Sequence, residues 1–97
     1  FRIKDNLVML NKKNILVTGG TGSFGKAFIK KVLKTYNVKR LVIFSRDELK
    51  QYEMSNDDYF KKQKSLRYFL GDIRDKSRLL LALKDIDIVV HAAALSL

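Results

Sequence analysis

The sequence predicts an α/β fold in which helices cover both faces of a parallel β-sheet. Apolar runs rich in β-branched residues occur at 14–18, 40–45, 66–70 and 86–92, and the stretches between them are long enough for helices. The runs are continuous rather than alternating, which is typical of strands that are buried on both faces. We therefore expect the order β-α-β-α-β-α-β, with right-handed crossovers joining the strands.

The segment after the first apolar run is predicted to form an amphipathic helix. Lys26, Lys30 and Lys34 recur every four residues and therefore share one helix face. The apolar residues of the segment fall on the other side: Phe28, Ile29, Val32, Leu33 and Tyr36. We expect the lysines to face solvent while the apolar side chains pack on the sheet.

Two later helix starts carry capping signals. Ser45 and Glu48 stand at the spacing of a capping box, and Asp75 is a candidate N-cap for a helix that contains Leu79, Leu80 and Leu83. The segment 54–64 is interpreted as a helix end followed by an exposed loop.

The length favours one domain over residues 1–97, and the lack of a transmembrane run and of a signal peptide leads us to expect a cytoplasmic one. The chain has no cysteine, no apolar run of about 18 residues and no signal-peptide cleavage site, so we expect no disulfide and no transmembrane segment. Because the chain opens at Phe1 rather than at Met, we expect that it has been trimmed.

The formal net charge of +10, with no acidic residue between positions 6 and 46, raises the question of a nucleic-acid or membrane partner. The lysines after the first run are accounted for as a solvated helix face, and no nucleic-acid-reading motif is present. We therefore predict no nucleic-acid binding. The charge mainly favours anionic small molecules.

Gly19, Gly22 and Gly25 form G-x-x-G-x-x-G between the first predicted strand and the first helix. Bare backbone at Gly19 and Gly22 lets a pyrophosphate approach the positive end of the helix, while Gly25 allows close packing. A flexible turn would explain one or two glycines, but not three at this spacing in this context. The motif therefore predicts dinucleotide binding.

The end of the second strand should carry the residue that reads the adenosine ribose, about twenty residues after the motif. Ser45 and Arg46 occupy this place. A serine hydroxyl and a guanidinium suit a 2′-phosphate, which favours NADP. Two alternatives stay open: Ser45 only caps a helix while Arg46 faces water, or Asp47 and Glu48 select NAD.

Four segments carry a family resemblance: "TGGTGSFG", "FSRDELKQYEM", "YFLGDIRD" and "DIVVHAAAL". In this order and spacing they resemble the N-terminal part of the extended short-chain dehydrogenase/reductases, most closely the configuration-inverting UDP-N-acetylglucosamine 4,6-dehydratases. The resemblance runs from about residue 10 to Leu95. It implies an NADP-dependent Rossmann-type three-layer fold, with strand order 3-2-1-4, that forms the N-terminal part of a doubly wound domain.

The resemblance also implies roles for individual positions in cofactor binding. Beside Gly19 and Gly25, the residues expected to line the pyrophosphate are Thr21, Gly22, Ser23 and Phe24. Those expected around the adenosine phosphate are Ser45, Arg46, Asp47, Glu48, Leu49 and Lys50. Asp72 and Ile73 are expected to flank the adenine, and Ala92, Ala93 and Ala94 the ribose on the nicotinamide side. We assign His91 a structural role, and no residue a catalytic or metal-binding one.

The acid/base pair of the family, Tyr-x-x-x-Lys, is absent from this chain. The residues four positions after each tyrosine are Arg40, Asn56, Gln63 and Asp72. A full-length enzyme of this kind would use NADP to convert a UDP-sugar to a 4-keto-6-deoxy product with inversion at C5. We expect this chain to be a truncated portion that is inactive alone; the alternatives are a non-catalytic NADP-binding module and another nucleotide-sugar epimerase or reductase.

The resemblance implies a homo-oligomer for the full-length enzymes. For the chain itself, the strand order leaves "IDIVVHAAAL" as an uncovered edge. Because an apolar edge strand can pair with another chain, we expect the fragment to self-associate.

Overall fold

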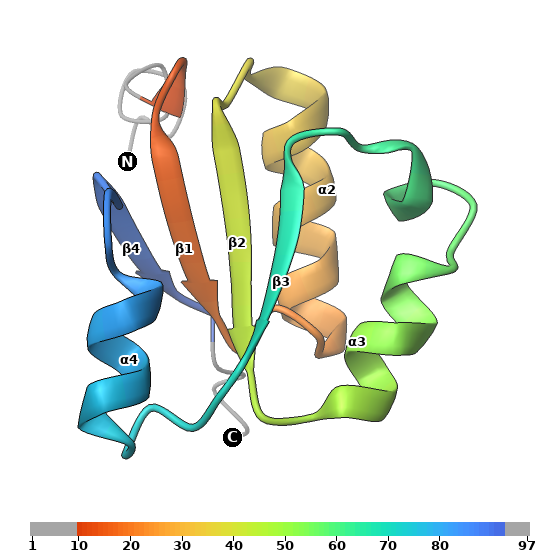
Figure 1. Ribbon diagram of the computed structural model, residues 1–97. Helices are drawn as coiled ribbons and strands as arrows, with labels where there is room; N and C mark the ends of the chain where they lie inside the picture. The colour runs from red at the N-terminus through yellow and green to blue at the C-terminus, as the bar shows by residue number, and fades with distance from the viewer. Residues whose placement is uncertain (1–9, 93–97) are drawn as a thin grey trace.

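The computed structural model describes residues 10–92, which form a four-stranded sheet with helices packed on it (Figure 1). The strands are β1 (Asn14–Thr18), β2 (Arg40–Ser45), β3 (Leu66–Leu70) and β4 (Ile88–His91). The helices are α2 (Ser23–Thr35), α3 (Glu48–Ser55) and α4 (Lys76–Ala82), and a 3-10 turn, η2, covers Phe60–Lys62. The first three predicted strands are confirmed at their predicted bounds, and the fourth is shorter than the predicted 86–92.

The strand order is β3-β2-β1-β4, and each neighbouring pair is parallel, which confirms the predicted topology. The chain runs outward from β1 to β3 and then returns to place β4 on the other side of β1. β1 therefore ends where the strand order reverses, the position at which open α/β sheets bind ligands. In Figure 1 the helices α2, α3 and α4 all begin at the edge of the sheet where the strands end.

The sheet has a hydrophobic core on each face. Ile15, Val17 and Ile43 point toward α2, while Leu16 and Phe44 point toward α4, because successive side chains of a strand alternate between faces. Each of these five residues is 1% exposed or less. Figure 1 shows α2 and α3 on one face and α4 on the other, which gives three layers.

The apolar face of α2 is confirmed. Ile29 and Val32 are buried in the core, and the other predicted apolar side chains, Phe28, Leu33 and Tyr36, are partly buried against it. The lysines on the opposite face are exposed.

β4 departs from the prediction that every strand is covered on both faces. Val89 is 54% exposed and His91 is exposed, whereas Ile88 and Val90 pack against the core on the side of α2. The reason is geometric: α4 packs over Leu16, Val42 and Phe44, so it covers β1 and β2. No other described helix lies on this face.

The capping box predicted for Ser45 and Glu48 is wrong. Asp47 is the N-cap of α3, since its Oδ1 accepts a hydrogen bond from the Lys50 amide at 3.0 Å. Ser45 is still in β2, two residues too early for that position. The predicted cap Asp75 is confirmed, because its side chain accepts from the Arg78 amide at 3.2 Å.

The segment after α3 is largely exposed, as predicted, but one of its residues is buried. Phe60 of η2 is 7% exposed and belongs to the core. Tyr59 lies edge-on to Phe60, and the ammonium groups of Lys30 and Lys34 lie 5.0 and 5.4 Å from the centre of its ring. Two lysines of the solvated α2 face therefore also hold this segment against α2.

Candidate functional site: a nucleotide-binding edge

The glycine turn between β1 and α2 is built from backbone that excludes side chains. Gly19 has φ of 70°, a conformation that favours glycine. A Cβ at Gly25 would lie 2.5 Å from the Gly19 carbonyl oxygen, and one at Gly20 would lie 2.8 Å from Ile29 Cδ1. Gly25 thus permits close packing as predicted, although its contact is with the turn rather than with the strand. The packing role of Gly20 was not predicted.

Gly22 differs from the other glycines of the turn because the fold itself does not require it. Its backbone is extended, with φ of −76° and ψ of 172°, and a Cβ there would meet only the Gly19 carbonyl oxygen, at 3.9 Å. The space in front of Gly22 is therefore open to a ligand, and this is the position where the motif needs bare backbone for a pyrophosphate.

The first turn of α2 offers unshared backbone donors at the same place. The first helical hydrogen bond runs from the Lys26 amide to the Gly22 carbonyl at 2.9 Å, so the amides of Ser23, Phe24 and Gly25 precede it. Gly22 supplies no side-chain cap, and the first turn holds no acidic residue. The positive end of the helix is thus uncompensated, which suits an anion.

The carboxyl ends of the strands surround a hollow of about 510 Å³, which we call the strand-end hollow. It is lined by Thr18, Gly19, Phe44, Ser45, Arg46, Gly71, Asp72, Ile73, Arg74 and His91. Five of the predicted cofactor-binding residues meet in it: Gly19, Ser45, Arg46, Asp72 and Ile73.

Ser45 lies at the end of β2 with its hydroxyl oriented by the following turn. Its Oγ accepts a hydrogen bond from the Asp47 amide at 3.0 Å. Because the oxygen is the acceptor in that bond, the hydroxyl proton is free to be donated to an anion in the hollow.

Arg46, Asp72 and Arg74 form a charged cluster at the rim of the strand-end hollow. Arg74 Nη2 donates to Asp72 Oδ2 at 2.7 Å, whereas Arg46 Nη1 lies 3.5 Å from the same oxygen. The hydrogen bonds from Arg74, more than the charge of Arg46, hold the pKa of the Asp72 carboxyl well below its usual range. The cluster therefore carries two cations and one carboxylate at neutral pH.

A second hollow of about 360 Å³ lies between the start of α2 on one side and α3 with the segment after it on the other; we call it the helix-start hollow, after α2. It is lined by Thr21, Gly22, Ser23, Lys26, Lys50, Glu53, Met54, Asp57 and Phe60. Four further predicted residues meet here: Thr21, Gly22, Ser23 and Lys50. The predicted set thus divides between two neighbouring hollows on either side of the glycine turn.

The remaining predicted residues that the structure describes line neither hollow. The side chains of Phe24 and Leu49 are 62% and 64% exposed, and Glu48 is also exposed. Asp47 is engaged as a helix cap. Ala92 is 3% exposed and belongs to the core, with its amide bonded to the Thr18 carbonyl at 2.8 Å. Ala93 and Ala94 lie outside the described residues.

Ten of the residues that line the two hollows were not assigned to a site from the sequence, among them Thr18, Lys26, Arg74 and His91. Thr18 and His91 end adjacent parallel strands, and Thr18 Oγ1 is hydrogen-bonded to His91 Nδ1, which is compatible with a structural role for the histidine. Lys26 was interpreted only as a solvated residue. Arg74 was overlooked, although its position two residues after Asp72 is a signal, since an Asp side chain often accepts from the backbone two residues on.

No helix among residues 10–92 is long and apolar enough to cross a membrane.

The family described as "Polysaccharide biosynthesis protein" matches residues 15–96. The UDP-N-acetylglucosamine 4,6-dehydratase (inverting) of Campylobacter jejuni subsp. jejuni serotype O:23/36 (strain 81-176) is 54% identical to the chain over 87 residues. The alignment covers 90% of this chain and 25% of that enzyme, so the chain spans about a quarter of the length of the curated relatives it matches.

Two solved structures have the same fold over most of the chain. Pen from Bacillus thuringiensis superposes with a TM-score of 0.79 and 36% identity, covering 91% of this chain and 26% of that one. The dTDP-glucose 4,6-dehydratase from Bacillus anthracis str. Ames, in complex with NAD, gives a TM-score of 0.70 and 27% identity, covering 87% and 27%. With its Rossmann-type sheet, its glycine turn and these likenesses, the chain belongs to the polysaccharide biosynthesis protein family of the extended short-chain dehydrogenase/reductases.

Proposed function

We propose that the chain is the NADP-binding portion of a C5-inverting UDP-N-acetylglucosamine 4,6-dehydratase that acts in the cytoplasm in surface-polysaccharide or glycan biosynthesis. The observation that carries this proposal is the 54% identity over 90% of the chain to an enzyme of that name. Because the alignment covers 90% of the chain, it includes the glycine turn and the ends of β1, β2 and β3, which are parts that would hold a cofactor.

The residues at the sheet edge fit a dinucleotide. The open space before Gly22 and the free amides of the first turn of α2 would receive the pyrophosphate. Asp72 and Ile73, at the end of β3, would flank the adenine in the strand-end hollow. Ala92 and its neighbours would lie beside the ribose on the nicotinamide side, with Ala92 contributing backbone because its side chain is buried.

Two contacts favour NADP over NAD. The Ser45 hydroxyl can donate to a 2′-phosphate, and Arg46 lies beside it with a side chain that is 73% exposed. Asp47, the first acid after the end of β2 in the sequence, lines neither hollow, and its Oδ1 already accepts from the Lys50 amide at 3.0 Å. A carboxylate that already caps a helix is less available to accept a hydrogen bond from the 2′-hydroxyl of the ribose.

The cofactor would supply the redox chemistry, taking a hydride from C4 of the sugar and returning it at C6. This chain would bind and orient the cofactor. The acid/base groups are proposed to lie in the remaining length typical of the relatives, because none of the four tyrosines is followed by lysine at the spacing of the family pair. The chain alone is therefore proposed to be catalytically inactive.

The proposed partners are a UDP-sugar, bound in the complete enzyme, and further copies of the chain. Val89 is 54% exposed at the β4 edge, and Leu80 and Leu81 of α4 are each 59% exposed. Such an apolar face beside an edge strand favours self-association.

Calorimetric titration of the chain with NADP and with NAD tests the cofactor proposal. We expect NADP to bind more tightly; binding of neither dinucleotide would contradict the proposal.

A chimera tests the enzymatic proposal. Residues 10–92 are placed in the Campylobacter jejuni dehydratase instead of the matching quarter, and the 4-keto product from UDP-N-acetylglucosamine is measured. We expect turnover by the chimera and none by the chain alone. A folded chimera that binds NADP but forms no product would contradict the assignment to this reaction.

A further inference from the structure

The charged cluster at the strand-end hollow distributes its contacts unevenly. Arg74 binds Asp72 through its backbone amide to Oδ1 at 2.9 Å, through Nε to both oxygens at 3.1 and 3.2 Å, and through Nη2 to Oδ2 at 2.7 Å. Arg46 has one contact with the same carboxylate, Nη1 to Oδ2 at 3.5 Å. Asp72 is thus occupied by Arg74 and only weakly engaged by Arg46.

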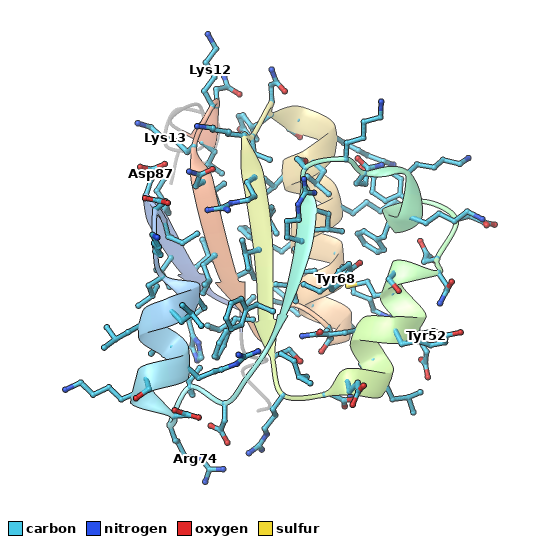
Figure 2. All side chains as sticks on the ribbon, in the orientation of Figure 1. Lys12, Lys13, Tyr52, Tyr68, Arg74 and Asp87 are labelled. Atoms are coloured by element: carbon cyan, nitrogen blue, oxygen red, sulfur yellow. The ribbon has the colours of Figure 1, made fainter. Side chains whose placement is uncertain are left out.

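The two arginines are similarly exposed but come from different loops. The side chains of Arg46 and Arg74 are 73% and 77% exposed, while that of Asp72 is 29% exposed. Arg46 directly follows β2, whereas Arg74 precedes the N-cap of α4, and Figure 2 shows Arg74 projecting at that end of the sheet. Arg46 is therefore the arginine beside Ser45, where a 2′-phosphate would lie.

Without Arg74, Asp72 would oppose NADP in two ways. Its carboxylate would attract Arg46 into a closer ion pair, because no other cation lies within 4.0 Å of it among the described residues. It would also place an uncompensated negative charge in the hollow that receives the phosphate, and like charges repel at this range. Both effects act on the 2′-phosphate and leave NAD, which lacks that group, nearly unaffected.

We propose that Arg74 is a specificity-determining residue for NADP: by occupying the Asp72 carboxylate, it leaves Arg46 available to the 2′-phosphate. This inference rests on the proposed NADP-binding function. Arg74 acts through Asp72 and not by touching the cofactor, so its effect depends on the charge at position 72.

A double-mutant cycle tests this dependence. The chain and the variants Arg74→Ala, Asp72→Asn and Arg74→Ala/Asp72→Asn are titrated with NADP and NAD, and the ratio of the two affinities is compared, so that losses shared by both cofactors cancel. We expect Arg74→Ala to reduce the NADP/NAD ratio about fivefold. In the Asp72→Asn background the same change should alter the ratio less than about twofold.

Two further variants serve as controls. Lys76→Ala removes an exposed cation close to Arg74 in sequence without any contact with Asp72, and the ratio should stay constant. Arg74→Lys keeps the positive charge but loses the planar guanidinium that binds the carboxylate with several donors. Its NADP/NAD affinity ratio should therefore lie between those of the wild type and Arg74→Ala. A ratio that falls with Lys76→Ala as much as with Arg74→Ala would indicate general electrostatics and overturn the inference.

The outcomes separate this inference from the proposed function. A chain that binds NADP no better than NAD overturns both. If the wild-type chain prefers NADP and the Arg74→Ala variant has the same NADP/NAD affinity ratio, only the role of Arg74 is overturned. An equal loss in both backgrounds overturns the action through Asp72 and indicates direct contact with the phosphate.

Discussion

The two ends of the β-sheet each carry a hollow rich in cations, yet only one has the features of a nucleotide site. The hollow at the amino end has a volume of about 600 Å³, against about 510 Å³ for the strand-end hollow. It is lined by Lys12, Asn14, Lys39, Arg40, Arg67, Asp85, Ile86 and Asp87. Figure 2 shows Lys12 and Arg74 at opposite ends of the sheet.

The difference lies in the backbone. At the carboxyl end, the amides of the first turn of α2 are unshared, and Gly22 leaves them accessible. At the amino end, the Asn14 amide donates to Asp87 Oδ2 at 2.8 Å, and α2 presents its C-terminus, where carbonyl groups dominate. Cationic side chains attract anions to both ends, but only the carboxyl end adds oriented backbone donors.

Gly25→Ala should have the largest effect. A Cβ there would lie 2.5 Å from the Gly19 carbonyl oxygen and 2.6 Å from Gly20 Cα, so the turn must move. We expect the free energy of unfolding to fall by about 1–3 kcal/mol and binding of both cofactors to be lost. Denaturant unfolding and calorimetry measure the two effects. Wild-type stability in this variant would disprove the close packing.

Gly22→Val should abolish binding while leaving the fold intact. Its backbone is extended and the position is open, so the side chain is tolerated but occupies the place of the pyrophosphate. We expect the affinities for NADP and NAD to fall together by about 100-fold or more, since charge-assisted hydrogen bonds to the amides are lost. Calorimetry checks the affinities and thermal unfolding the fold. Unchanged affinities would mean that the pyrophosphate lies elsewhere.

Arg46→Ala should distinguish the two cofactors. We expect NADP affinity to fall about 10- to 150-fold while NAD affinity stays nearly constant, because only NADP carries the 2′-phosphate. Titration of the variant with each cofactor measures this. An equal loss for both cofactors would contradict the assignment of the phosphate site.

Neutralising the amino end should have the smallest effect. Lys12→Gln/Lys39→Gln removes two exposed cations from the larger hollow. We expect both cofactor affinities to change by less than about twofold in 0.15 M salt, because screening leaves little interaction across the sheet. A loss as large as that of Arg46→Ala would show that the carboxyl end is not the binding edge.

The strands could be predicted from the sequence because each apolar run is bounded by helix or turn signals, whereas their order was predicted from the family resemblance. β4 was the exception. Its continuous apolar sequence is typical of a buried strand. Whether Val89 is buried, however, depends on which helix packs over it, and the position of a helix is a property of the tertiary structure. The helix cap at Asp47 was missed because Ser45 and Glu48 have the right spacing, while the strand runs on to Ser45.

The glycine turn and the end of β2 were recognisable because their chemistry is local in sequence. The cluster of Arg46, Asp72 and Arg74 was not, since it forms only when β2 and β3 lie side by side. Spacing alone could not reveal that Gly20 is a packing glycine, because its neighbours Ile29 and Ile43 come from other elements.

The central position of β1 has a consequence for the order in which the sheet assembles. Ile15 pairs with Leu41 of β2, 26 positions away, but with Ile88 of β4, 73 positions away. Loop-closure entropy makes the second pairing about 0.9 kcal/mol more costly. β4 also contributes an exposed edge, so it should join the sheet last and open first, and its amide protons should exchange with solvent faster than those of β2. The hydrogen bond between Thr18 and His91 should then form in the final step of folding.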